Sequence, residues 1–221
     1  MARGSTATPR TRPYHRGNLA ETLVGIGVEL AVEGGPEALS LREAARRAQV
    51  SPTAVYRHFA DRSALVEAVQ RVVLGRLADA LTRALAAPAA VHDDPVRAAR
   101  ERLAAIGAAY VEFAVAHPGE YRMIFAGQCF PKAGASSSGA EGVPADGPYT
   151  ILSTVLDDMV RAGAMSPEAR PGAEIPAWSA VHGLASLILE GPYAELDHHQ
   201  RTAITDQVVG VLVAGLTSRH C

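Results

Sequence analysis

The chain has 221 residues, 48% of them hydrophobic, and a formal net charge of −2. This length is enough for one or two domains with a sizeable core, and no run of about 18 apolar residues predicts a membrane span. No apolar signal region follows the N-terminal arginines, so we expect a cytoplasmic protein. The two cysteines, Cys129 and Cys221, lie far apart without metal-ligand spacing, and a cytosolic chain keeps them reduced.

The N-terminal part of the sequence predicts an arm followed by a helix. Residues 1–16 are polar and carry four arginines among threonine and proline, which indicates a flexible basic arm. Asn18 and Glu21 then have the spacing of a helix cap and its partner. A stripe at helical spacing follows, made of Leu19, Leu23, Ile26 and Leu30. Gly34-Gly35-Pro36 ends this predicted helix.

Two short capped helices separated by a tight turn come next. Ser40 can cap a helix that extends to Ala48, with Glu43 at the third helical position of a capping box. After the turn Gln49-Val50, Ser51 caps a second helix, and Pro52 takes its first position, where the missing N–H costs nothing. Such a helix–turn–helix places its second helix in the major groove of DNA.

A family resemblance supports this interpretation. Residues 17–65 resemble the DNA-binding head of the TetR family of bacterial transcriptional regulators, most clearly in Val50-Ser51-Pro52-Thr53-Ala54-Val55-Tyr56-Arg57-His58-Phe59. The family pattern is roughly V-S-x-x-x-hydrophobic-Tyr-x-His/Tyr-Phe-x-x-Lys-x-x-Leu. This chain has Arg62 where lysine is usual, which keeps the charge but replaces a point charge by a planar fork. Val55 and Phe59, spaced i and i+4, are predicted to pack inward.

The helix–turn–helix supplies the candidate DNA contacts. They are Arg42, Arg46, Ser51, Pro52, Thr53, Ala54, Tyr56, Arg57, His58 and Arg62. The resemblance implies that Tyr56, His58 and Arg62 contact phosphates, while residues 52–54 face base edges. Tyr56 could instead cover the small core. Arg42 and Arg47, the latter an alternative to Arg46, could simply be solvated.

The charge is distributed unevenly along the chain. Residues 1–62 contain nine arginines and six acidic residues, a net charge of +3, so the remainder carries −5. A basic head on an acidic body is expected when one end meets nucleic acid. The arm could then reach into the minor groove, as related arms do; a solvated leader is the alternative.

Beyond residue 65 the apolar residues keep helical spacing and show no strand-like alternation. The predicted helices cover residues 65–85, 96–117, 121–125, 149–162, 175–190 and 202–216. Breaks are expected at residues 88–95, at Pro118-Gly119 and in a Gly/Ser/Pro-rich flexible loop at residues 131–148. The predicted fold is all-α, with a three-helix DNA-binding head (residues 17–65) and a helical ligand-binding and dimerisation domain (residues 66–221).

The last two predicted helices have apolar residues on more than one face. Such helices need two partners. In the TetR family two C-terminal helices pair with their copies in a four-helix bundle, so the resemblance implies a homodimer. Its two heads would bind a palindromic operator whose half-sites lie about one DNA turn apart or somewhat more. A monomer with a buried helical hairpin is the alternative.

The C-terminal part also resembles one subgroup of the family. Trp178-Ser-Ala-Val-His182-Gly183 has its Trp-x-x-x-His-Gly (WHG) pattern, and residues 117–125 fit it too. The resemblance implies a small-molecule effector inside the helical bundle that releases a repressor from DNA. Candidate lining residues are Tyr110, Phe113, His117, Met123, Phe125, Met159, Trp178 and His182. His182 could instead be a core histidine against Trp178, and the others could be ordinary core residues.

Other classes of function fit the sequence less well. Acid and histidine residues cluster at His92-Asp93-Asp94, Asp157-Asp158 and Asp197-His198-His199, without metal-ligand spacing, a phosphate loop or a nucleophile motif. We therefore expect no enzyme, no cofactor and no bound metal. The remaining alternative is a helical small-molecule-binding or scaffold protein without sequence-specific DNA function. The cluster at residues 56–62 argues against it, since a carrier has no need of those residues.

Overall fold

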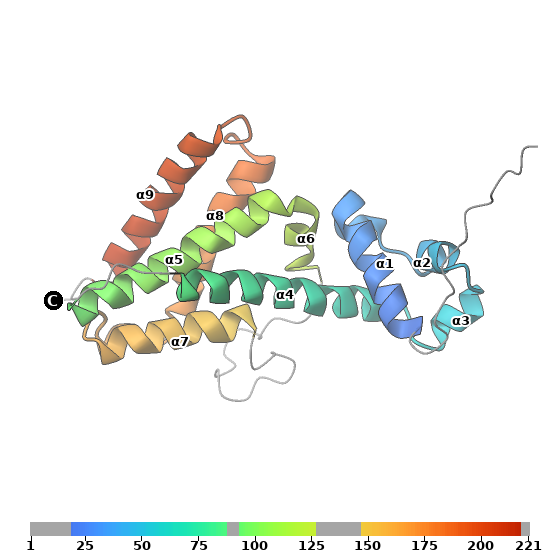
Figure 1. Ribbon diagram of the computed structural model, residues 1–221, viewed down its shortest axis with the longest axis horizontal. Helices are drawn as coiled ribbons and strands as arrows, with labels where there is room; N and C mark the ends of the chain where they lie inside the picture. The colour runs from blue at the N-terminus through green and yellow to red at the C-terminus, as the bar shows by residue number, and fades with distance from the viewer. Residues whose placement is uncertain (1–18, 88–92, 127–146, 218–221) are drawn as a thin grey trace, which may run out of the picture.

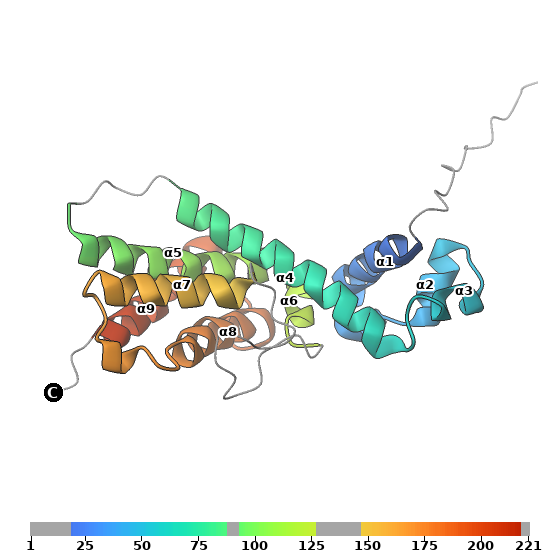
Figure 2. The same ribbon diagram turned by 90° about the horizontal axis from the view of Figure 1, so that it is seen from below.

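The computed structural model describes residues 19–87, 93–126 and 147–217, and the regular elements within them are helices. A small head and a larger body lie at opposite ends of an elongated molecule, and one long helix runs from the first into the second (Figures 1 and 2). The head comprises α1 (Leu19–Gly34), η1 (Gly35–Ala38), α2 (Leu41–Ala48) and α3 (Pro52–Tyr56). The long helix is α4 (Arg62–Ala86). The body adds α5 (Pro95–Ala116), α6 (Pro118–Met123), α7 (Pro148–Arg161), η2 (Pro167–Ala169), α8 (Glu174–Glu190) and α9 (His198–Thr217).

Local capping forms the head much as the sequence predicts. The Ser40 hydroxyl accepts a hydrogen bond from the Glu43 N–H at 3.1 Å, and Ser51 accepts one from the Ala54 N–H at 3.3 Å. Val55 and Phe59 are buried, as predicted. The expected cap residue Asn18 lies outside the described residues. The arm at residues 1–16 does so too.

Helix α3 is shorter than the i, i+4 spacing of Val55 and Phe59 predicts. It ends at Tyr56, and in the turn that follows the N–H groups of His58 and Phe59 both donate to the Val55 carbonyl, at 2.9 and 3.0 Å. This last turn leads into Asp61, whose carboxylate caps α4 through the Ala64 N–H at 2.9 Å.

Close backbone packing joins the head to the rest of the molecule. Helix α1 packs on α4 at Gly27, where an added Cβ would lie 2.5 Å from a methyl carbon of Val69. It also packs on α6 at Gly119, where a Cβ would lie 2.3 Å from the carbonyl oxygen of Ala31. The predicted domain boundary at residues 65–66 falls inside α4, so the two parts share one continuous helix.

Helix α5 lies at the centre of the body and packs against α4, α6, α7, α8 and α9. One predicted break is in fact a helix start. Pro118-Gly119 opens α6, since proline fits the first helical position. The last helix, predicted over residues 202–216, begins earlier, at His198. Asp197 and Gln200 form a reciprocal cap at its start, in which each side chain accepts the other's N–H at 2.9 and 3.0 Å.

The Gly/Ser/Pro-rich segment predicted as a loop lies almost wholly outside the described residues, and α7 begins at Pro148. Residues 88–92, within the other predicted break, also lie outside them. None of the helices in the described ranges is both long and apolar enough to cross a membrane.

Candidate DNA interface and effector cavity

The exposed side of the head carries most of the predicted DNA contacts. Pro52 and Thr53 lie exposed at the start of α3, and Ala54 is half-buried. The Tyr56 side chain is 58% exposed, so the alternative that it covers the core is wrong. Arg57 and His58 are exposed beside it, which gives this end of the head a polar surface with aromatic and cationic groups.

Arg62 has a structural role that the sequence did not reveal. Its Nε donates to the Leu39 carbonyl at 2.8 Å and its terminal nitrogen to the Pro36 carbonyl at 2.5 Å. The start of α4 is thereby tied to the segment between η1 and α2. Contact of Arg62 with a phosphate remains a prediction, since these bonds use part of a fork that has five N–H donors.

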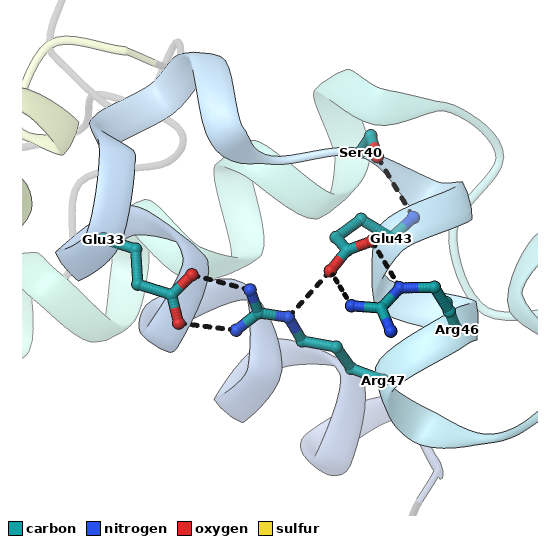
Figure 3. A network of polar contacts seen from close by, with 5 residues as sticks. All are labelled: Glu33, Ser40, Glu43, Arg46 and Arg47. Carbon is teal, nitrogen blue, oxygen red and sulfur yellow. Dashed lines mark hydrogen bonds and ion pairs between the residues drawn. The ribbon is translucent and has the colours of Figure 1, made fainter.

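The arginines of α2 form a network of ion pairs with two glutamates (Figure 3). Arg46 donates to both oxygens of Glu43, at 2.6 and 2.8 Å. Arg47 donates through Nε to Glu43 at 2.9 Å and through its two terminal nitrogens to Glu33 of α1 at 2.6 and 2.7 Å. Glu43 is therefore shared by two arginines, and Arg47 ties α2 to α1.

These hydrogen bonds keep the network charged over a wide pH range. Those from Arg46 and then Arg47 lower the pKa of Glu43 from 4.5 to about 2. The hydrogen bonds from Arg47 also lower the pKa of Glu33. Because the folded-state pKa of Glu43 lies below its unfolded value, the pairs are complete above pH 4.5 and are lost as pH falls towards 2.

We expect NMR titration of the Glu43 carboxyl group to show a midpoint well below 4.5. In Arg46→Gln the midpoint should rise towards 4.5, because the hydrogen bonds that lower the pKa most are gone. A Glu43 midpoint that is the same in the two proteins would contradict the network.

Inside the body, a polar cluster connects three helices. The Tyr110 hydroxyl of α5 lies 2.8 Å from His182 Nδ1 of α8. Tyr121 of α6 donates to the His182 carbonyl at 2.9 Å, and its oxygen lies 2.7 Å from the Ser186 hydroxyl. Aromatic rings surround the histidine: Trp178 meets Tyr110 edge to face, and Phe125 meets His182 in the same way.

The cluster is neutral at physiological pH. Burial raises the pKa of Tyr110 above its ordinary value and lowers the pKa of His182 below 6.5. Near pH 7 the phenol therefore keeps its proton, while the imidazole carries no charge. The phenol and imidazole groups of the cluster therefore act as neutral hydrogen-bond donors and acceptors.

A small cavity lies beside this cluster. Its volume is about 30 Å³ and its wall is mostly apolar, made by Leu81, Leu103, Ile106, Gly107, Tyr110, Pro148, Leu152, Ala177, Trp178, Val181 and Leu212. Of the predicted ligand-lining residues, Tyr110 and Trp178 line it, and His182 contacts Tyr110. Tyr110, Trp178 and His182 are therefore brought together by the fold.

The other predicted ligand-lining residues do not line this cavity. Met123 and Met159 are fully buried in the core, and Phe113 is buried with its ring against the exposed His117. Phe125 is partly exposed at the edge of the aromatic cluster. A ligand-binding role for these residues remains a prediction. Tyr121 and Ser186 also belong to the polar cluster, but the sequence did not predict them as site residues. Ser186 follows His182 by one helical turn, and this spacing is the signal that could have indicated it.

The capped head and helical body define a helix–turn–helix DNA-binding regulator. Two family models match the chain: bacterial regulatory proteins of the tetR family, over residues 26–69, and the tetracyclin repressor-like C-terminal domain, over residues 103–212. The chain belongs to the TetR family of DNA-binding transcription regulators, which are not enzymes.

Solved structures share this fold over nearly the whole chain. A protein of unknown function from Rhodococcus sp. RHA1 is 30% identical, with a TM-score of 0.68 and coverage of 94% of this chain and 100% of that one. The TetR-Q116A variant from Acinetobacter baumannii AYE, in complex with minocycline, is 20% identical, with a TM-score of 0.60 and coverage of 90% and 98%. The fatty acid degradation regulator FadR from Bacillus halodurans is 13% identical, with a TM-score of 0.62 and coverage of 93% and 100%. No curated protein sequence matched the chain.

Proposed function

We propose that this regulator is a cytoplasmic repressor that binds a palindromic operator as a homodimer and is released by a small-molecule effector. The head at residues 17–65 and the basic arm at residues 1–16 would bind DNA, and residues 66–221 would bind the effector and dimerise. Trp178 and His182 both contact Tyr110, which supports placing the chain in the WHG subgroup of the family.

A continuous set of contacts from the cavity to the head supports effector control. Tyr110 in the cavity wall bonds to His182, and His182 accepts a hydrogen bond from Tyr121 on α6. Two residues earlier on the same short helix, Gly119 packs directly on the backbone of α1. An effector that displaces Tyr110 or His182 would therefore move α6, and with it the base of the head. Binding that favours one head position over another shifts DNA affinity.

The cavity wall indicates the chemistry of the effector. Apolar side chains dominate it, with the Tyr110 and Trp178 side chains as its polar groups, so an apolar molecule with one or two neutral polar groups fits best. The volume of about 30 Å³ holds about one water molecule. Binding must therefore open the bundle, which is how occupancy would be converted into helix movement.

The outer face of α8 and α9 supports dimerisation. The buried residues of α9 are Thr205 and Val209, although the helix is rich in valine and leucine. A groove of about 420 Å³ lies between α8 and α9, lined by Ala180, Leu184, Tyr193, Ile204, Gln207, Val208, Val211 and Leu212. Both helices lie at the side of the body away from α2 and α3 (Figure 1). A two-fold axis here would leave both heads free for DNA.

We expect Val211→Asp to shift the protein from dimer to monomer, measured by sedimentation velocity across a concentration series. The Val211 side chain is 69% exposed in the single chain, so the change should leave the monomer folded while placing a charge inside the interface. Thr202→Asp serves as the control, because residue 202 lies on the opposite side of α9 and lines a groove towards α5. Dimers that persist in Val211→Asp would contradict this interface.

The central experiment measures binding of the purified protein to duplexes from the region upstream of its own gene, across a salt series. We expect tight binding to one palindromic fragment, falling steeply with salt. That fragment then serves to screen lipophilic metabolites for release. Binding no tighter than to random DNA on any fragment tested would instead favour a helical ligand carrier or scaffold.

A further inference from the structure

Glu43 is bound by two arginines in very different surroundings. Arg47 is held from both sides, by Glu43 and by the two oxygens of Glu33. Arg46 has a side chain that is 71% exposed and bonds to Glu43 alone among the described residues. Figure 3 shows that Arg47 bonds to a glutamate of α1 and one of α2, whereas Arg46 bonds to Glu43.

We propose that Arg46 exchanges between Glu43 and a DNA phosphate, and that Glu43 retains it when the head meets DNA of arbitrary sequence. This inference rests on DNA binding by the head. Helix α2 is the first helix of the helix–turn–helix, the one that crosses the DNA backbone. The exchange itself is a transfer of hydrogen bonds from a carboxylate to a phosphate, without covalent change.

The exchange of Arg46 has a low free-energy cost because Glu43 is shared by two arginines. When Arg46 leaves, Glu43 still accepts the hydrogen bond from Arg47 Nε at 2.9 Å. Arg47 leaves less readily than Arg46, because Glu33 also bonds its two terminal nitrogens, at 2.6 and 2.7 Å. The carboxylate therefore keeps one cation when Arg46 moves to the DNA. An isolated Glu43–Arg46 pair would lack this support.

Retention of Arg46 by Glu43 would raise sequence discrimination. When base contacts fix the head on its operator, a phosphate stays beside α2 long enough to form hydrogen bonds with Arg46. A loosely bound head on random DNA does not, so it makes one phosphate contact fewer, and the slope of log K against log salt is shallower by about 0.9. Non-specific binding is weakened, while operator binding keeps the contact.

The test is a double-mutant cycle on the full-length protein, with a random-sequence duplex and a KCl series. We expect Glu43→Gln to tighten binding about threefold to tenfold near 0.1 M salt and to steepen the slope by about 0.9. Arg46→Gln alone should change binding to the random duplex little, and adding it to Glu43→Gln should abolish the gain. On the operator fragment Arg46→Gln should weaken binding, and Glu43→Gln should lower the ratio of operator to random affinity.

Glu37→Gln provides the matched control. It makes the same change in net charge on the same head, at an exposed glutamate to which no described arginine bonds. The Glu43→Gln variant keeps the backbone N–H that Ser40 caps, and circular dichroism checks that the head stays folded. A gain from Glu43→Gln that survives Arg46→Gln, or that Glu37→Gln reproduces, would overturn the exchange. So would the absence of any gain. Failure of the unmodified protein to bind any duplex would instead overturn the proposed function.

Discussion

Alanine in place of Gly119 is expected to lower the free energy of unfolding by about 3 kcal/mol, at the upper end of what overpacking costs. The new Cβ would lie 2.3 Å from the Ala31 carbonyl oxygen and 2.7 Å from both Cα and O of Val32. These are backbone atoms of α1, which cannot swing aside as a side chain can. Helix α6 must therefore move away from α1. Urea unfolding followed by circular dichroism measures the loss.

The matched control is Gly75→Ala in the middle of α4. Gly75 has nothing within 4 Å of a built Cβ, so alanine should raise stability by about 0.5–1 kcal/mol through helix propensity. Stability changes of the same sign in the two variants would show that the α1–α6 contact is less tight than described. If Gly119→Ala still binds the operator, we expect it to have lost part of its response to the effector.

Loss of Arg170 is expected to cost about 3–5 kcal/mol, the usual result of removing one partner from a buried ion pair. Its guanidinium lies 2.9 Å from a carboxylate oxygen of Glu174, whose side chain is 6% exposed. It also donates to Asp157 at 2.7 Å and to the Ser153 hydroxyl at 2.8 Å, so it joins α7 to the start of α8. Arg170→Met leaves the Glu174 carboxylate buried without this cation. Urea unfolding measures the cost.

A double variant tests whether the unpaired Glu174 carboxylate causes this loss of stability. Arg170→Met with Glu174→Met should recover much of the lost stability, because an apolar pair replaces the ion pair without leaving a charge behind. Arg161→Met is the control, since Arg161 forms an exposed pair with Asp158 and should cost at most about 1 kcal/mol. A double variant as unstable as Arg170→Met alone would locate the effect in Asp157 or Ser153 instead.

The structural features that the sequence predicts well depend on residues that lie close together along the chain. The caps at Ser40 and Ser51 and the buried Val55 follow from spacings of three or four residues, which a helix brings together. The reciprocal cap of Asp197 and Gln200 has a signal of the same kind. Grouping Asp197 with the two histidines that follow it hides that signal.

The parts that escaped prediction join residues distant in the sequence. Arg62 bonds to carbonyls 23 and 26 residues before it, and Arg47 pairs with a glutamate 14 residues away. Nothing in the local pattern of an arginine distinguishes such a structural role from contact with DNA. In the body, Trp178 and His182 are spaced i, i+4, so they lie on one face of α8. The hydrogen bonds of Tyr121, which connect this cluster to α6, cannot be predicted without knowing how α5 and α8 pack.

Because α4 is continuous, a small tilt at one end of the helix becomes a large displacement at the other end. A helix of 25 residues is about 37 Å long at 1.5 Å per residue. Its first residue, Arg62, is tied to carbonyls of the head, while its middle is tied to α6 by the pair of Arg76 with Glu120. A tilt of about 5° at the body end of such a lever displaces the far end by about 3 Å. In a dimer two levers act at once, so a change too slight to alter the body's core would noticeably alter the separation of the two recognition helices.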